Sequence, residues 1–224
     1  MPCKFQVLAF PLVFLAFGCA GTANRVMPGY NRMDVTGNVL GVILMKNSMQ
    51  ILNSEDVTSA LGSGVPEEAY YKFFATEFPA AIKECSKFSR VYFLPGADQR
   101  MQQSAGSTLN NSGERASLPS RRGFISDTLN YLLILDFLSI KHERKANLGV
   151  SGGSDGNFAG FSGGSENMTH TATFVLWDNI KGTIAAYGNI REKAAVFDTV
   201  TKEYWVNMLK NMARSVTNGM PFGK

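Results

Sequence analysis

The sequence predicts a two-layer α/β domain, in which a mixed sheet of about five strands packs against helices that include a C-terminal helix. Three observations lead to this prediction. Apolar runs flank a helical stripe in the first half of the chain, three strand-like segments follow one another in the second half, and an amphipathic segment comes last. The chain has 224 residues, of which 45% are hydrophobic, and this is enough for the core of one domain.

We place the domain at residues 38–224. The sequence of its first half predicts a β-α-β unit. Residues 38–45 are continuously apolar, as is typical of a strand covered on both faces. A short helical turn is expected around residues 56–61, and residues 66–85 predict a longer helix. Residues 90–94 predict the second strand of the unit.

The long helix has the expected signals at its start. Pro66 suits the first turn, and Glu67 and Glu68 place negative charge at the positive end of the helix dipole. Pro79 is expected to kink or divide the helix, because it removes one backbone hydrogen bond. The residues that form one apolar stripe are Tyr70, Phe74, Phe78, Ile82 and Cys85.

The second half predicts a three-strand meander. Residues 131–140 form the most apolar segment and are expected to be the central strand. Residues 169–177 alternate between two faces, residues 178–182 carry a hairpin-turn signal, and residues 183–191 return as the third strand.

The closing helix is expected to begin near Asp198 or Thr199 and to stop at Gly219 and Pro221. Its apolar stripe consists of Val200, Tyr204, Met208, Met212 and Val216.

Composition and charge exclude several classes of protein. With 18% charged residues and a normal apolar fraction, the chain is not wholly disordered. No collagen or heptad repeat runs through it. The formal charge of +4 is small and scattered, so we expect no nucleic-acid partner.

The N-terminus predicts a signal peptide. Lys4 supplies one positive charge, and residues 5–18 are apolar apart from Gln6 and Pro11. This run is shorter than the ~20 residues of a membrane-spanning helix, but it fits the apolar region of a secretory signal. We therefore expect residues 1–18 to be removed.

Small residues lead into Cys19 at the end of this run. The segment Leu15-Ala16-Phe17-Gly18-Cys19 resembles the lipobox of bacterial lipoproteins, although the usual leucine three residues before the cysteine is Ala16 in this chain. The resemblance implies that the Cys19 thiol receives a diacylglycerol and that acyl chains such as palmitate anchor the protein to a membrane. The alternative is an ordinary secretory signal that is cleaved near a cysteine.

The lipoprotein resemblance also implies a location. Ala20 replaces the aspartate that holds some lipoproteins at the inner membrane, so we expect the outer membrane of a bacterial envelope, facing the periplasm. Residues 19–37 lack periodicity and are expected to be a lipidated tether. Once Cys3 is removed and Cys19 is acylated, Cys85 has no disulfide partner, and we expect it to be buried.

Two polar segments interrupt the domain. Residues 96–122 are rich in Gln, Ser and Gly and locally basic through Arg115, Arg121 and Arg122, while residues 149–165 are rich in glycine. The basic segment is either a solvated loop or a contact for an acidic partner or lipid headgroups. We expect both segments to be contact surfaces, because loops on a rigid scaffold often carry recognition.

The element order resembles that of a group of bacterial envelope lipoproteins. The likeness lies in residues 126–134 entering the central strand, in the hairpin at residues 175–182, and in the closing helix ending at Met220-Pro221, and it covers residues 38–222. The group includes the curli-secretion lipoprotein, the lipoprotein activators of penicillin-binding proteins, and the N-terminal domain of the Tol-Pal translocation protein. It implies a binding or assembly module. One member implies a ring-forming export subunit, but the Gly, Ser and Gln content of the loops argues against membrane insertion.

Two serines match a catalytic pattern. Ser151 and Ser162 both lie in G-x-S-x-G segments, where a strand-to-helix turn would expose a nucleophile beside a histidine. No helical pattern follows either copy, and the near-repeat has the composition of a flexible loop. A lipid-anchored serine hydrolase, with Ser151 or Ser162 as nucleophile and His170 as base, is therefore the alternative.

The remaining chemical candidates give no convergent set. His142 is expected at a solvated strand end, and His170 as a hydrogen-bonded histidine at the edge of the core. Asp155 and Glu166 lack the EF-hand spacing for calcium. Asp136 lies in the most apolar strand and needs a hydrogen-bond partner if it is buried. We expect a structural hydrogen bond, and a functional acid is the alternative.

These observations predict a lipid-anchored, non-enzymatic envelope protein that binds or assembles with other envelope proteins. We expect no catalytic residue, no metal and no cofactor. The sequence leaves the oligomeric state undetermined.

Overall fold

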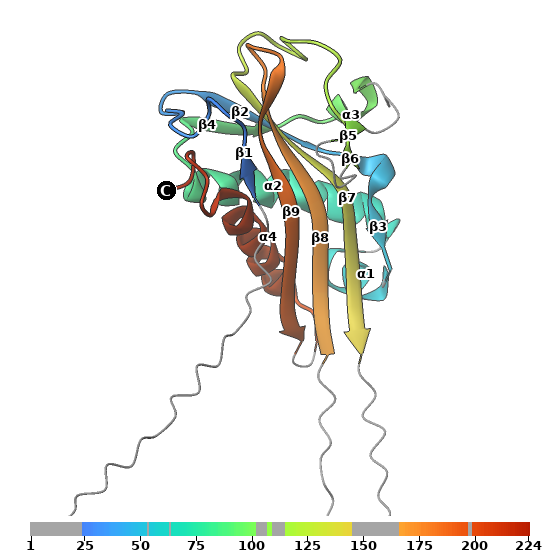
Figure 1. The fold of residues 1–224 in the computed structure, drawn as a ribbon. Helices are drawn as coiled ribbons and strands as arrows, with labels where there is room; N and C mark the ends of the chain where they lie inside the picture. The colour runs from blue at the N-terminus through green and yellow to red at the C-terminus, as the bar shows by residue number, and fades with distance from the viewer. Residues whose placement is uncertain are drawn as a thin grey trace, which may run out of the picture.

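A seven-stranded mixed sheet organises the chain (Figure 1). The structure, a computed structural model, describes residues 24–52, 54–62, 64–101, 107–108, 115–144, 166–196 and 199–224. The strand order is β1-β9-β8-β7-β2-β4, and β3 extends the sheet beside β7. Their bounds are β1 Arg25–Val26, β2 Val39–Leu44, β3 Gln50–Ile51, β4 Arg90–Phe93, β7 Tyr131–Arg144, β8 Glu166–Asp178 and β9 Thr183–Val196.

The predicted fold class and topology are confirmed. Strand β2 pairs in parallel with both β4 and β7, and β7, β8 and β9 form the antiparallel meander. Strands β1 and β3 were not expected, because a two-residue strand is too short to show a hydrophobic period. A separate two-stranded sheet joins β5 Ser107–Thr108 to β6 Arg115–Ala116.

The helices are α1 Ser54–Leu61, α2 Pro66–Cys85, α3 Ala97–Arg100 and α4 Lys202–Thr217, and a 3-10 turn, η1, spans Lys46–Ser48. Helix α2 continues through Pro79 as one helix. Helix α4 begins later than predicted, because the hydroxyl of Thr201 accepts a hydrogen bond from the Tyr204 N–H and caps the helix there.

The main core lies between the sheet and the helices α1, α2 and α4, which Figure 1 shows behind the long strands. Tyr70, Phe74, Phe78 and Ile82 of the predicted α2 stripe are fully buried there. Cys85 differs from the prediction, because the last residue of α2 lies at the rim of the core and is only half-buried.

The described part of the predicted tether, residues 24–37, packs on the domain. Strand β1 pairs with β9, with Arg25 opposite Tyr187, and Tyr30 and Val35 are buried in the main core. The domain therefore begins before residue 38. The sequence did not indicate this, because scattered apolar residues have no period and their contacts lie far away along the chain.

The other face of the sheet has a partial cover. Helix α3 and residues 115–130 pack on it, so that these parts of the 96–122 segment are not a solvated loop. The buried side chains of the larger cluster are Val39, Ile43, Met45, Ala97, Met101, Phe124, Leu129, Leu132, Ile134 and Trp177. Ala116 of β6 packs separately against Val175 and Tyr187.

Candidate functional site

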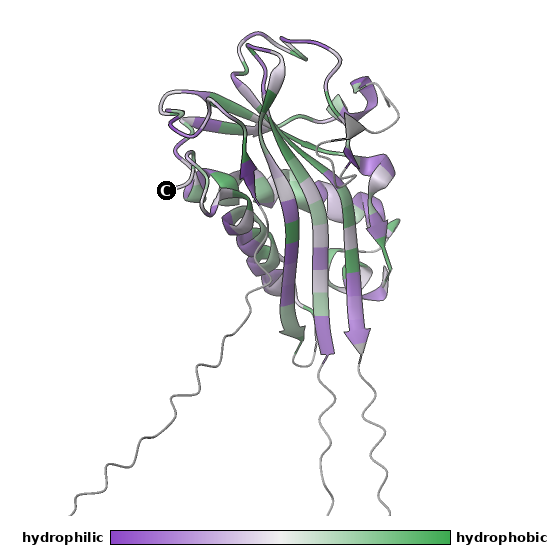
Figure 2. Cartoon of the chain, viewed as in Figure 1, coloured by the Kyte–Doolittle hydropathy of each residue, from purple (hydrophilic) through white to green (hydrophobic). Residues whose placement is uncertain are grey.

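Three long strands extend beyond this cover. Strands β7, β8 and β9 have 14, 13 and 14 residues. Among the described residues, the apolar clusters on the covered face reach no farther along these strands than Ile134, Val175 and Tyr187. Beyond them the side chains on this face are mostly polar. Figure 2 shows hydrophilic residues, in purple, along the lower part of β7 and β9. We call this surface the open face; it consists of Ser139, Lys141, Glu143, Asn167, Thr169, Thr171, Arg191, Lys193 and Ala195.

Cations flank threonines on the open face. Thr169 of β8 lies between Lys141 of β7 and Lys193 of β9, and Thr171 has Arg191 as its neighbour on β9. Directly opposite residues on a sheet bring their side chains within contact distance. The open face therefore presents hydroxyl groups and positive charges side by side.

The positive charge of the open face exceeds its negative charge. Lys141, Arg191 and Lys193 give three positive charges, against one negative charge from Glu143. The Lys141 ammonium lies 3.1 Å from the Glu143 carboxylate, and both groups are accessible to solvent. Such a pair is worth little in stability, so the surplus charge remains available to a partner.

A bulge in β7 marks the upper border of the open face. The register with β8 shifts between Asp136 and Ser139, and Phe137 adopts a positive φ of 51° with half of its surface exposed. A bulky residue in this conformation is strained. The Phe137 N–H donates to Oδ1 of Asp136 at 2.9 Å and to Oγ of Ser48 at 3.1 Å, and these bonds hold the bulge.

Asp136 is buried and has the structural hydrogen bonds that the sequence predicts. Its Oδ1 accepts from the Ser48 hydroxyl as well as from the Phe137 N–H, and its Oδ2 accepts from the Ser117 N–H at 2.7 Å. The Asp136 carboxylate thus links η1, the bulge of β7 and the segment of residues 115–130 that packs on the sheet.

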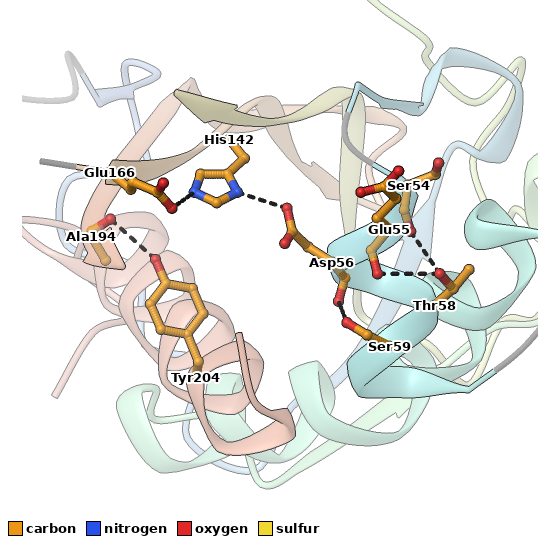
Figure 3. Close-up of polar contacts among 9 residues, drawn as sticks. All are labelled: Ser54, Glu55, Asp56, Thr58, Ser59, His142, Glu166, Ala194 and Tyr204. Atoms are coloured by element: carbon orange, nitrogen blue, oxygen red, sulfur yellow. Dashed lines mark hydrogen bonds and ion pairs between the residues drawn. The ribbon is translucent and has the colours of Figure 1, made fainter. Parts of the chain in front are cut away.

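His142 is not at a solvated strand end. Its side chain is 2% exposed, with Nδ1 2.8 Å from Oδ2 of Asp56 and Nε2 3.1 Å from Oε2 of Glu166 (Figure 3). Asp56 belongs to the first turn of α1, so this contact links α1 to the end of β7. The sequence did not indicate this contact, because the two residues lie 86 positions apart.

A tyrosine lies next to this histidine. Tyr204 Oη donates to the carbonyl oxygen of Ala194 at 3.1 Å (Figure 3). Burial, and secondarily the negative charge of Asp56, raise the pKa of Tyr204 to about 12. The phenol therefore stays protonated at neutral pH and acts as a donor that joins α4 to β9.

His170 lies in the core instead of at its edge. Its ring stacks on Tyr70 at a centroid distance of 6.1 Å and meets the edge of Trp205 at 5.5 Å. Neither ring nitrogen has a hydrogen-bond partner in the described part of the chain. Complete burial lowers the pKa of His170 to about 3, so the imidazole is neutral at neutral pH.

This environment does not suit a catalytic base. A base must reach the proton that it accepts and is normally oriented by a hydrogen-bonding acid. His170 is enclosed by apolar side chains and has no such acid among the described residues. The serine candidates, Ser151 and Ser162, lie outside the described residues, as do Asp155 and the lipidation candidate Cys19.

Within the described ranges, no three His, Cys, Asp or Glu side chains come together in a way that would bind a metal. Glu166 lies against His142. None of the helices in these ranges has both the length and the apolar character that crossing a bilayer requires.

The chain matches no protein-family model and no curated protein sequence. Among solved structures it is similar to the PelC dodecamer of Paraburkholderia phytofirmans, at 10% identity over 91% of this chain and 98% of PelC, with a TM-score of 0.40. A single-substitution variant of that PelC dodecamer gives 10% identity, 87% and 97% coverage, and a TM-score of 0.36. A homologue of a neuraminyllactose-binding hemagglutinin from Helicobacter pylori gives 8% identity, 83% and 82% coverage, and a TM-score of 0.38.

The resemblance to the curli-secretion, penicillin-binding-protein-activator and Tol-Pal groups stays a prediction.

Proposed function

We propose that the protein is a lipid-anchored, non-enzymatic component of the bacterial envelope that binds another envelope protein through its open face. The observation that carries this proposal is the end of the apolar cover at Ile134 of β7, Val175 of β8 and Tyr187 of β9. Beyond these residues the strands present threonines and an excess of cations. A partner with an acidic surface complements such a face.

Phe137 supports the same surface. It is a large aromatic side chain, half-exposed, in a backbone conformation that costs free energy. Aromatic residues are frequent among the side chains that dominate binding energy in protein interfaces. Its position at the border of the open face makes it the natural apolar anchor of the interaction.

The proposed anchor rests on the sequence around Cys19. Intact mass and membrane fractionation of the full chain, expressed in a bacterium, test it directly. We expect the wild type to begin at Cys19, to carry acyl mass and to sediment with membranes, whereas Cys19→Ala stays unacylated. If the two proteins have the same unacylated mass and fractionate alike, the lipoprotein part of the proposal is wrong.

Site-specific crosslinking tests the binding part. A photo-crosslinking amino acid at Thr171, on the open face, should capture a protein partner in cells, and the same amino acid at Thr76, exposed on helix α2, should not. Adding Arg191→Glu and Lys193→Glu should abolish the Thr171 product, because the charge complementarity is reversed. Equal crosslinking from Thr171 and Thr76, or none from Thr171, would reject the open face as the binding surface.

A further inference from the structure

We propose that α3 and residues 115–130, which cover part of the sheet, form a binding pocket for a phosphate ester. The pocket has a volume of about 470 Å³ and opens between the end of α3 and the turn that follows residue 119. Its lining residues are Arg100, Ser120, Arg121, Gly123, Phe124 and Ile125. Its lining includes no residue of the open face, and the argument for it does not use Cys19, so the inference goes beyond the proposed function and does not depend on it.

Two guanidinium groups from different elements line the pocket. Arg100 ends α3 and Arg121 lies between β6 and β7. Neither side chain forms an ion pair or hydrogen bond within the described ranges. Like charges placed at one cavity repel each other unless an anion lies between them. The planar fork of a guanidinium matches phosphate oxygens in a two-point contact, and the Ser120 hydroxyl adds a further donor.

The wall of the pocket is held in place before any ligand binds. The buried side chain of Asn179 accepts from the Phe124 N–H at 2.8 Å, and its backbone carbonyl accepts from the Gly123 N–H at 2.7 Å. Its amide group also donates to the carbonyl oxygens of Ser126 at 3.1 Å and Leu129 at 3.0 Å. A preformed wall reduces the ordering cost of binding.

The same wall carries backbone strain. Ile125 has a φ of +70°, a region that β-branched residues rarely occupy. Gly123 also has a positive φ, +64°, which glycine adopts without strain. Strained residues persist where the surrounding structure fixes them, and they are concentrated at ligand sites. Here these residues are held by the hydrogen bonds of Asn179 and by the packing of Phe124 in the larger cluster on this face of the sheet.

The shape and chemistry of the pocket select the ligand class. Its volume exceeds that of an inorganic phosphate ion and lies in the range of pockets for organic ligands. The two arginines accommodate an anionic head, while the half-buried Ile125 offers apolar contact to an organic body. The Asp127 carboxylate lies close to Gly123 at the wall, and the two guanidinium charges outnumber it.

A soluble phosphate ester and a phospholipid headgroup share this chemistry, and binding measurements separate them. The probes are glycerol 3-phosphate, inorganic phosphate, and vesicles of phosphatidylglycerol or of phosphatidylcholine. We expect glycerol 3-phosphate to bind the full chain carrying Cys19→Ala, and Arg100→Gln and Arg121→Gln each to weaken this binding by about tenfold or more. Arg122→Gln is the matched control, because Arg122 is exposed and adjacent but does not line the pocket.

The outcomes decide between the sources and the proposal itself. Binding of glycerol 3-phosphate that depends on Arg100 and Arg121 supports a soluble ester, and the same dependence with phosphatidylglycerol vesicles alone supports a lipid headgroup. If no probe binds, or if Arg122→Gln weakens binding as much as the two pocket variants, the pocket assignment is wrong. Unchanged thermal midpoints of the three variants exclude unfolding as the cause, and neither result bears on Cys19 or the open face.

Discussion

Nδ1 of His142 lies 2.8 Å from Oδ2 of Asp56, and this contact joins helix α1 to the end of strand β7. Both groups are largely removed from solvent, with side-chain exposures of 2% and 14%. A buried polar contact of this kind contributes more to stability than an exposed ion pair does. Removing one of the two groups leaves the other buried without a hydrogen-bond or charged partner.

We predict that His142→Phe lowers the free energy of unfolding by about 1–3 kcal/mol, because it keeps a ring in the cavity but removes both contacts to carboxylates. Urea-induced unfolding at neutral pH measures the change. Lys141→Gln is the control in the same strand, where an exposed charge is lost and a change within about 0.5 kcal/mol is expected. A His142→Phe protein as stable as the wild type would mean that the contact contributes nothing.

His170 predicts a dependence of stability on pH. Burial holds the pKa of His170 at about 3 in the folded protein, while the unfolded chain has a histidine pKa of about 6.5. Below about pH 6.5 the unfolded state therefore binds a proton that the folded state refuses, so stability falls as the pH drops toward 3. At about pH 5 the loss from this one residue is about 2 kcal/mol.

His170→Phe provides the test of this dependence. The substitution removes the titrating group and the unpaired ring nitrogens, so the variant should be more stable than the wild type, and increasingly so at lower pH. Urea unfolding at several pH values between about 5 and 8 compares the two proteins. A constant difference across this range would show that His170 does not titrate on unfolding.

Phe137 allows strain and binding to be separated. Asparagine tolerates positive φ better than phenylalanine does, so Phe137→Asn should leave stability unchanged or raise it by up to about 1 kcal/mol. If Phe137 anchors a partner, the same substitution should remove the crosslinked product formed from Thr171. Chemical unfolding and crosslinking of this variant give the two results independently, and a destabilised variant would argue that the exposed ring packs against the domain.

The sequence was sufficient for the parts of the fold with strong local patterns. The apolar run of β2, the alternation in β8 and the stripe of α2 each need only neighbouring residues to be recognised. Asp136 was recognised for the same reason, since a carboxylate in an apolar strand requires a hydrogen-bond partner wherever that partner comes from.

The parts that were missed depend on contacts between distant residues. His142 meets Asp56 only through the position of α1, and Val35 is buried only because residues 24–37 pack against the main core. Arg121 was noted as a basic residue, but Arg100 became its neighbour through the packing of α3 on the upper sheet. No local period or motif encodes contacts between residues so far apart in the sequence. Alternation of polar and apolar residues also does not indicate how much of a strand other segments pack against.

Asn179, in the turn after β8, holds residues 124–129 in place. Replacing its amide group with a carboxyl group tests the orientation of that amide. Its Nδ2 donates to three carbonyl oxygens, those of Phe124, Ser126 and Leu129. Asn179→Asp would place a carboxylate oxygen against these acceptors in a buried site, and an unpaired buried charge is costly. We expect the free energy of unfolding to fall by about 3–5 kcal/mol at neutral pH.

Asn211→Asp makes the same chemical change on the half-exposed surface of α4, where Oδ1 already accepts from Arg214, and should change stability by no more than about 0.5 kcal/mol. Lowering the pH toward the range where a buried carboxyl is protonated should recover part of the loss in Asn179→Asp, since the neutral acid can donate one hydrogen bond. Urea unfolding of both variants across pH measures this recovery. If Asn179→Asp matches the wild type at neutral pH, Nδ2 does not face the three carbonyls, and the wall of the phosphate pocket is not held by this residue.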